Sequence, residues 1–254
     1  MCRMLTVVSR TPQTLSEVVG PPHRAVFDAL SYDHRDGWGA GWRDTGGQVQ
    51  VVKGAEPAVQ EARYASALAS TSSDQLLVHL RKASPGMVVE LKNCHPFTDG
   101  EVLFCHNGQI EVSQDLRASV TERGGRPCEG TTDSELYFAL LLLHAQTLPW
   151  PQAVAEAVRE VYRDAVAHAA PPMALNCFVL TPTHTYAYGH HEPTRLAPTM
   201  HQDFYRLQWA QTGTDVVIAS SLWPLRGGSM APDRQVIEVD RATLGVTVHP
   251  RVTV

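Results

Sequence analysis

The sequence predicts an α+β fold, because strand-like runs lie toward both ends of the chain and two long helical runs lie between them. The strand-like runs are short and rich in apolar residues, and the central runs show helical periodicity. No regular alternation of strand and helix is present, which argues against a parallel sheet. Because no linker, internal repeat or low-complexity segment divides the chain, we expect a single domain over residues 2–254.

The first half is predicted to combine strands with short helices. A glycine at every second position, at Gly37, Gly39 and Gly41, would leave bare backbone on one face of a strand. That strand either packs under another element or forms an edge where backbone approaches a ligand. Strands are predicted over 2–8, 49–53, 75–82 and 102–107, and helices over 21–30, 58–70 and 113–124.

The second half is predicted to start with two long helices and to continue as strands. Thr132 and Glu135 have capping-box spacing, and the following residues 136–143 are apolar nearly all round, which indicates a buried helix. Pro151 begins a second, amphipathic helix. Strands are predicted over 174–180, 185–188, 216–220, 236–239 and 246–249, with a hairpin turn at 181–184.

Composition excludes several classes of function. The 254 residues are 43% hydrophobic and 19% charged with a net charge of −5, and without a basic run we expect no nucleic-acid or membrane partner. The start of the chain does not read as a signal peptide. Five cysteines without a C-x-x-C pattern argue against a disulfide framework or zinc site and fit the cytoplasm. At residues 190–192, His-His-Glu fits a polar turn better than a metal site, so we expect no metal.

Cys2 is the first residue whose chemistry suggests a function. If Met1 is removed, the Cys2 thiol and a free α-amine lie on one residue, which gives a nucleophile with its own general base. An α-amine titrates near pH ~8 and a thiol near ~8.5, so the two can exchange a proton near neutrality. Alternatively, Cys2 is simply a small apolar residue that begins a strand.

Polar residues at the ends of apolar runs are the other candidates. Arg81 ends an apolar strand, where it either snorkels or pairs with an acid, or else clamps a ligand carboxylate with its planar guanidinium. Asn107-Gly108 ends another, and these residues alone favour a hairpin turn. The alternative is that the Asn107 amide and the Gly108 N–H are two donors aimed at one oxygen. Asp133, in a first helical turn, is explained by the helix dipole alone.

Read together and in order, these motifs resemble those of the class II glutamine amidotransferases, which are N-terminal-nucleophile hydrolases. Each motif is short, and the specificity of the resemblance comes from their order along the first half of the chain. The matching stretches are 1–3, 34–39, 78–84, 93–97, 106–108 and 133–135.

The resemblance implies a four-layer αββα sandwich of two antiparallel sheets between helical layers. It implies that Cys2, as the mature N-terminus, is the nucleophile and that Asn107 and Gly108 form the oxyanion hole. It also implies that Arg81 binds the α-carboxylate of the substrate and that Asp133 binds its α-ammonium group. A charged amino-acid head needs one cation and one anion, and this pair would supply both.

The pocket on the side of the leaving group departs from part of the family. His95 is expected in the wall of the site rather than as a base, and Ser84 is expected to contact substrate. Members fused to a synthase carry an aromatic residue and Thr-His after the arginine, where this chain has Lys82, Ser84 and Pro85. The sequence therefore resembles small stand-alone members, including the γ-glutamyl hydrolases of the ergothioneine pathway.

The leading hypothesis is a hydrolase of γ-glutamyl amides, acting on glutamine or on a γ-glutamyl metabolite through a γ-glutamyl thioester. The resemblance implies neither a metal nor an organic cofactor. The alternative is a glutaminase subunit that delivers ammonia to a separate synthase. A third hypothesis, a non-enzymatic relative with a binding role, conflicts with the full set of chemical residues.

Overall fold

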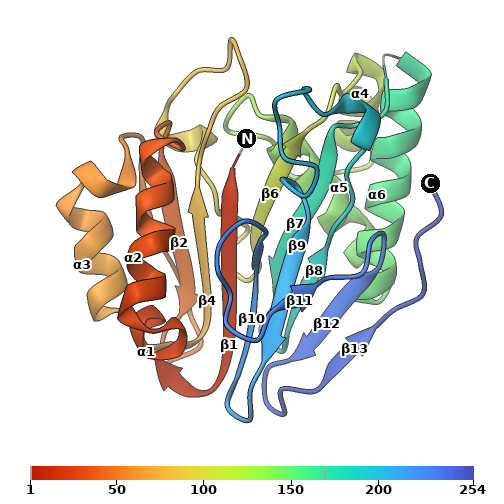
Figure 1. The fold of residues 1–254 in the computed structure, drawn as a ribbon. Coiled ribbons are helices and arrows are strands. Elements are labelled where there is room, and N and C mark those ends of the chain that lie inside the picture. The colour runs from red at the N-terminus through yellow and green to blue at the C-terminus, as the bar shows by residue number, and fades with distance from the viewer. Residues whose placement is uncertain (1, 169) are drawn as a thin grey trace.

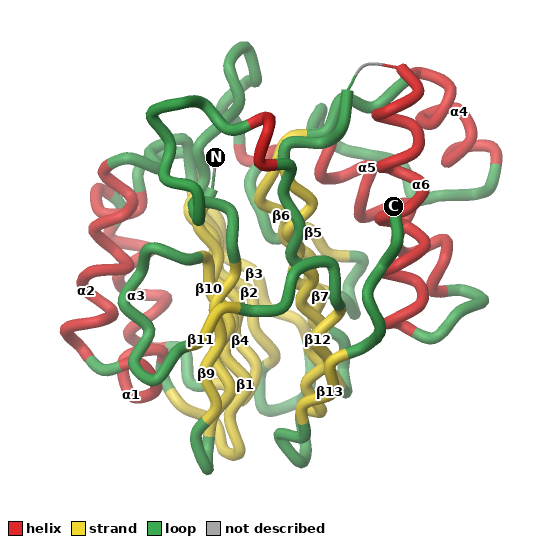
Figure 2. Tube along the Cα trace, turned by 45° about the vertical axis from the view of Figure 1, so that its right-hand side comes forward, coloured by secondary structure: helices red, strands yellow, loops and turns green. Residues whose placement is uncertain are grey.

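The protein is a four-layer sandwich in which two antiparallel sheets lie face to face between two layers of helices (Figures 1 and 2). The structure, a computed structural model, describes residues 2–168 and 170–254. The predicted α+β class and the αββα layering are confirmed. The described chain begins between the two halves of the molecule, at the start of β1 and next to β6 (Figure 1).

The first sheet contains the N-terminal strand in its interior. Helices α1 (Leu15–Val19), α2 (Pro21–Ala29) and α3 (Ala62–Ser70) cover its outer face (Figure 1). Across the sheet, the strands in the described chain follow the order β11 (Ser229–Met230), β9 (Leu207–Gln211), β10 (Asp215–Ser220), β1 (Arg3–Gln13), β4 (Ser73–Leu80), β2 (Trp38–Arg43) and β3 (Val49–Gly54).

The second sheet lies against the first and carries the other helical layer. Helices α4 (Gln114–Glu122), α5 (Asp133–Ala145) and α6 (Trp150–His168) cover its outer face. Its strands, within the described residues, follow the order β13 (Val246–Val248), β12 (Val236–Asp240), β8 (His184–Tyr188), β7 (Ala174–Leu180), β6 (Leu103–Gln109) and β5 (Phe97–Thr98). Short 3₁₀ turns lie at Leu30–Tyr32, Ala58–Gln60, Leu91–Asn93 and Pro193–Arg195.

Apolar side chains fill the spaces between the layers. Met4 and Leu77 from the first sheet meet Phe178 from the second between the sheets. Trp38 packs between the first sheet and its helices, and Phe104 packs between the second sheet and α5. Because successive strand residues face opposite ways, each central strand contributes to two of these layers. The first residues of β1, next to Cys2, are therefore buried on both faces.

The structure corrects three expectations. Asn107-Gly108 is not a hairpin turn, because both residues lie inside β6, whose partner β7 comes from beyond the central helices. Residues 58–61 form a 3₁₀ turn and its end, so the helix predicted over 58–70 begins only at Ala62. Gly37 precedes β2, whereas Gly39 lies within it, where a Cβ would come 1.9 Å from the His95 carbonyl oxygen. The packing explanation for the glycine pattern is therefore confirmed.

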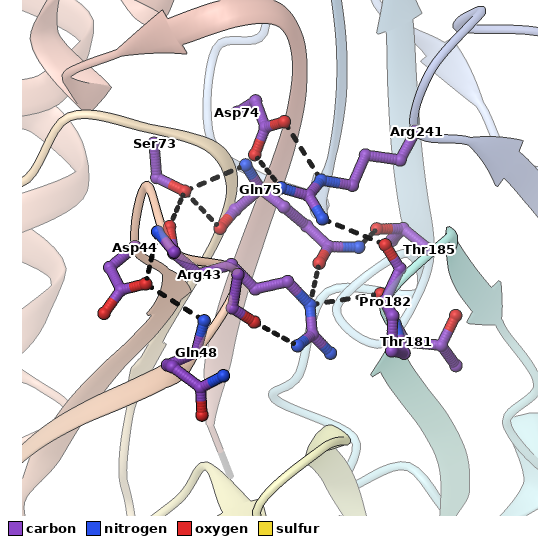
Figure 3. A network of polar contacts seen from close by, with 12 residues as sticks. Arg43, Asp44, Gln48, Ser73, Asp74, Gln75, Thr181, Pro182, Thr185 and Arg241 are labelled. Carbon is purple, nitrogen blue, oxygen red and sulfur yellow. Dashed lines mark hydrogen bonds and ion pairs between the residues drawn. The ribbon is translucent and has the colours of Figure 1, made fainter.

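A polar network joins the two sheets near the start of β4, the end of that strand opposite Arg81, and Figure 3 shows its side chains. The buried Arg43 guanidinium, on β2, donates to the Gln75 side chain and to the Thr181 carbonyl, which follows β7. Gln75, on β4, in turn donates to the Thr185 hydroxyl of β8 at 2.9 Å. Arg241 pairs with Asp74 at 2.8 Å. These contacts bind the first sheet to the β7–β8 hairpin of the second and so fix the relative position of the sheets.

Candidate active site

Cys2 lies buried at the start of β1, between the two sheets. Its backbone nitrogen donates to the Asn107 Oδ1 atom at 2.9 Å, and its Sγ atom lies 3.7 Å from the Lys82 carbonyl oxygen. The β1–β4 register pairs Arg3 with Leu80, so one further antiparallel step places Cys2 opposite Arg81. Met1 lies outside the described residues. Strand pairing thus brings the predicted nucleophile to the predicted carboxylate clamp.

Asn107 presents an unused donor next to Cys2. Its Oδ1 atom accepts the Cys2 N–H, which orients the amide, and the buried Nδ2 atom has no hydrogen-bond partner among the described residues. A buried donor left unpaired costs about 1–3 kcal/mol, so such groups in native proteins require an explanation. The Asn107 amide is therefore available to donate to a group outside the described residues.

The Gly108 N–H lies on the edge of β6 that faces away from β7. The neighbouring Gln109 carbonyl accepts from Met173 on the β7 side, and backbone groups of successive strand residues point to opposite edges. The Gly108 N–H therefore faces away from β7, where β5 has already ended after pairing with Leu103 and Phe104. A Cβ at Gly108 would come 1.9 Å from the Ala174 carbonyl oxygen, so only glycine fits.

Arg81 directly follows β4 and is buried, 3% exposed. Its guanidinium donates to the backbone carbonyls of Asp36 at 3.1 Å and of Val88 at 3.4 Å. Within residues 2–168 and 170–254, Arg81 forms no ion pair with a carboxylate. A buried guanidinium without a carboxylate has an uncompensated charge, and its planar donors match a carboxylate ligand.

Asp133 is the first residue of α5 and is half-buried. Its Oδ2 atom accepts the Ile110 N–H at 2.7 Å, and its Oδ1 atom accepts the Ser134 N–H at 2.9 Å. Thr132 caps the helix as predicted, but the Glu135 side chain accepts from the backbone of residues 129 and 130, so the capping box is incomplete. In the described part of the chain, no cationic side chain pairs with Asp133.

His95 and Ser84 differ in how closely the structure ties them to this site. The buried His95 ring lies 4.2 Å from the His79 ring and 4.6 Å from the Phe97 ring, between centroids. Burial holds the pKa of His95 well below its ordinary value, so the ring is neutral. Ser84 lies in the loop after Arg81, where its carbonyl accepts the Met87 N–H. Its side chain makes no hydrogen bond to any other described residue.

Two supporting groups were not identified from the sequence. His106 Nε2 donates to the Ala174 carbonyl, so His106 Nδ1 accepts from the Ser134 hydroxyl at 2.9 Å and ties β6 to the start of α5. Asp36 holds the loop after Arg81, because its carboxylate accepts the Ala83 N–H at 2.8 Å. Both residues lie inside motifs noted above, and only the fold shows what they contact.

Residues 2–168 and 170–254 contain no group of three or more His, Cys, Asp or Glu side chains arranged to hold a metal ion. Across those same residues, no helix is both long enough and apolar enough to span a membrane.

Comparison with protein families gives a match over most of the chain. The sequence model described as glutamine amidotransferases class-II matches residues 1–207. A probable glutamine amidotransferase, DUG3, from Saccharomyces cerevisiae is 29% identical over 161 residues, which cover 56% of this chain and 45% of that protein. A gamma-glutamyl-hercynylcysteine sulfoxide hydrolase from Mycolicibacterium smegmatis is 30% identical over 150 residues, which cover 56% of this chain and 62% of that protein. The matches thus span about half to three fifths of these relatives.

Solved structures support the same fold over nearly the whole chain. A glutamine aminotransferase class-II domain protein from Silicibacter pomeroyi superposes with a TM-score of 0.71 at 19% identity, covering 99% of this chain and 100% of that one. The glutamine phosphoribosylpyrophosphate amidotransferase from B. subtilis gives a TM-score of 0.68 at 14% identity, covering 99% of this chain and 49% of that one. At these identities the likeness concerns the fold, which is that of glutamine amidotransferases.

Proposed function

The chain belongs to the class II glutamine amidotransferases, and from this premise we propose that it hydrolyses γ-glutamyl amides, with Cys2 as its nucleophile. The observation that carries the proposal is the contact between Cys2 and Asn107. One oxygen of the Asn107 amide holds the Cys2 nitrogen, and the amide nitrogen is buried without a partner among the described residues. The contact supports the proposal because the Cys2 thiol would then lie beside an N–H donor that has no partner in the described chain.

The proposed reaction proceeds through a thioester. After loss of Met1, the Cys2 α-amine takes the thiol proton, and Sγ attacks the γ-carbonyl carbon. The carbonyl oxygen becomes an oxyanion that accepts from Asn107 Nδ2 and the Gly108 N–H. When the C–N bond of the substrate breaks, the protonated α-amine of Cys2 gives its proton to the departing amine. Water, deprotonated by the same amine, then attacks the γ-glutamyl thioester and releases glutamate and the thiol.

Arg81 and Asp133 would hold the head group of the substrate. The Arg81 guanidinium is buried without a carboxylate partner in the described chain, and Asp133 lacks a cationic one. A substrate α-carboxylate and α-ammonium would supply both partners at once. His95 and Ser84 would line the remaining wall, with His95 neutral and therefore unable to repel the ammonium group.

We further propose that the natural substrate carries an amine larger than ammonia. The support is the departure at residues 82, 84 and 85 from the pattern of synthase-fused members, together with relatives that are named as hydrolases of a γ-glutamyl compound. The competing candidate is a glutaminase that supplies ammonia to a separate synthase. Such an enzyme gains from being slow alone, because free ammonia is wasted, whereas a dedicated hydrolase should act unassisted.

Both the hydrolase activity and the preference for a larger amine are tested by steady-state kinetics. The assay measures release of glutamate from glutamine and from a panel of γ-glutamyl amines and peptides. Purified protein without a partner should hydrolyse at least one larger γ-glutamyl amide with a higher kcat/KM than glutamine. If glutamine is the best substrate, or if turnover begins only when a synthase is added, the ammonia-donor function replaces this one. If no γ-glutamyl amide turns over under any condition, the hydrolase proposal fails.

A further inference from the structure

The segment 203–206, which leads into β9, is held by its backbone beside the start of β1. Four successive carbonyl oxygens each accept a hydrogen bond from a residue elsewhere in the chain. Asp203 accepts from the Ser221 hydroxyl, Phe204 from Arg3 Nη1 at 2.9 Å, Tyr205 from Asn176 Nδ2, and Arg206 from the Ser221 N–H at 2.8 Å. Surface connections are generally more mobile than the elements that they join, so four carbonyls bonded to distant residues make this segment unusually fixed for a loop.

Two of these donors lie next to the proposed catalytic residues. Arg3 follows Cys2 in sequence, and Asn176 pairs with Asn107 across β6 and β7. The β1–β10 register pairs Leu5 with Ala219, so it places Ser221 opposite Arg3. Segment 203–206 is thus anchored to the nearest neighbours of both the nucleophile and the oxyanion donor, one in each sheet.

Arg3 makes the most specific of these contacts. Arg3 is 3% exposed, and its guanidinium carbon lies 3.7 Å from the centre of the Phe204 ring. Its Nη1 atom donates to the Phe204 carbonyl oxygen. Burial lowers the pKa of Arg3 to about 10, which still leaves it charged at neutrality. Within the described residues no carboxylate pairs with it, and the Phe204 ring and carbonyl contact the buried charge directly.

The order of the strands indicates which part of a bound substrate would lie against segment 203–206. In the first sheet β4, which leads to Arg81, lies on one side of β1, and β10 and β9 lie on the other. A γ-glutamyl head held by Arg81 therefore occupies the β4 side of Cys2. The amine on the other side of the scissile bond then points toward β10 and the connection from β8 to β9, which ends in segment 203–206.

We propose that Arg3 is a positioning residue that, by fixing segment 203–206, builds the wall against which the leaving amine packs. This inference rests on the function proposed above and names a determinant of its selectivity. Arg3 does not bond the substrate. It acts through Phe204 and the segment, and it therefore affects substrates with a bulky amine more than it affects glutamine.

The test compares Arg3→Met with Arg10→Met, a matched control that removes an exposed arginine from the same strand. The substrates are glutamine and γ-glutamyl-p-nitroanilide, and kcat/KM is measured because it reports only the steps up to release of the amine. We expect Arg3→Met to lower kcat/KM for the anilide at least tenfold more than for glutamine, and Arg10→Met to leave both within twofold. Hydrogen exchange of residues 192–206 should be faster in Arg3→Met alone.

Other outcomes separate the possible failures. An equal loss on both substrates would mean that Arg3 acts on the nucleophile, and wild-type values would mean that it has no role; either result overturns the inference. If Arg3→Met does not fold, Phe204→Leu keeps the carbonyl bond but removes the ring contact, and it should shift selectivity in the same direction by a smaller factor. Arg3→Lys should restore part of the selectivity. If the wild type hydrolyses neither these two substrates nor any other γ-glutamyl amide of the panel, the proposed function has failed rather than the role of Arg3.

Discussion

Replacing Asn107 with alanine tests the proposed oxyanion hole most directly. In the folded protein the Asn107 side chain makes one bond, from the Cys2 nitrogen at 2.9 Å, and leaves its buried Nδ2 atom without a partner in the described chain. Alanine removes the unpaired donor, which relieves about 1–3 kcal/mol, and it leaves the Cys2 nitrogen unpaired at a similar cost. We therefore expect the free energy of unfolding to change by no more than about 2 kcal/mol.

The effect on catalysis should be much larger. One oxyanion donor contributes about 3–4 kcal/mol to transition-state stabilisation, so Asn107→Ala should lower kcat by roughly 10²–10³. Asn107→Asp is the matched variant, because it keeps an acceptor for the Cys2 nitrogen but places a carboxylate where the donor was. If the bond to Cys2 were the whole role of Asn107, the aspartate variant would be active.

The assay combines steady-state kinetics on the best γ-glutamyl amide with thermal unfolding of each variant. A melting temperature within about 8 °C of wild type, with kcat reduced at least a hundredfold in both variants, supports the reasoning. A loss of less than tenfold in a folded Asn107→Ala protein would refute the assignment of Asn107 as an oxyanion donor.

The remaining predictions concern the nucleophile, the head-group clamp and a buried histidine. Cys2→Ala should retain less than about a hundredth of wild-type kcat in a folded protein, since covalent catalysis would be lost. Protein that keeps Met1 should be inactive because an amide nitrogen is no base, and mass spectrometry of active enzyme should show Cys2 first. Arg81→Lys and Asp133→Asn should each lower kcat/KM at least tenfold, about 1.4 kcal/mol. Wild-type kinetics in either variant would mean that the replaced residue does not bind the head group of the substrate. Burial lowers the pKa of His34 to about 4, below the ~6.5 of an unfolded histidine. The contribution of the neutral His34 ring to folding stability is therefore complete above pH ~6.5 and is lost as the pH falls toward ~4. His34→Gln should therefore flatten the pH dependence of the melting temperature in that window, and an unchanged slope would contradict this.

Strong local patterns predicted most elements of the fold. The apolar run at 174–180 has the bounds of β7, and the apolar 136–143 stretch lies within the buried helix α5. β9 was missed because its sequence, LQWAQ, is partly polar, and its strand form depends on pairing with β10. α1 was missed because five residues carry too little periodicity to distinguish a helix from a loop.

The sequence proposes a set of site residues, but it does not show their contacts. Asn107-Gly108 by itself favours a turn, and only the pairing of β6 with a strand from beyond α6 makes it an extended pair with one free edge. Likewise, an arginine after a strand can be noticed in sequence, whereas its bonds to Asp36 and Val88 depend on the paths of two loops. Contacts between residues this far apart are set by sheet order and register, which local patterns do not encode.

The division of the site between the two sheets explains why its residues are spread over half the chain. Cys2 and Arg81 are placed by adjacent strands of the first sheet, whereas Asn107, Gly108 and Asp133 are placed by β6 and by the helix on the second. The 2.9 Å bond from Cys2 to Asn107 forms only when the sheets pack at the right offset. The Arg43 network at the far end and the anchored segment 203–206 near Cys2 both set that offset. Side chains remote from the site therefore control whether the proposed nucleophile and the proposed oxyanion donor meet.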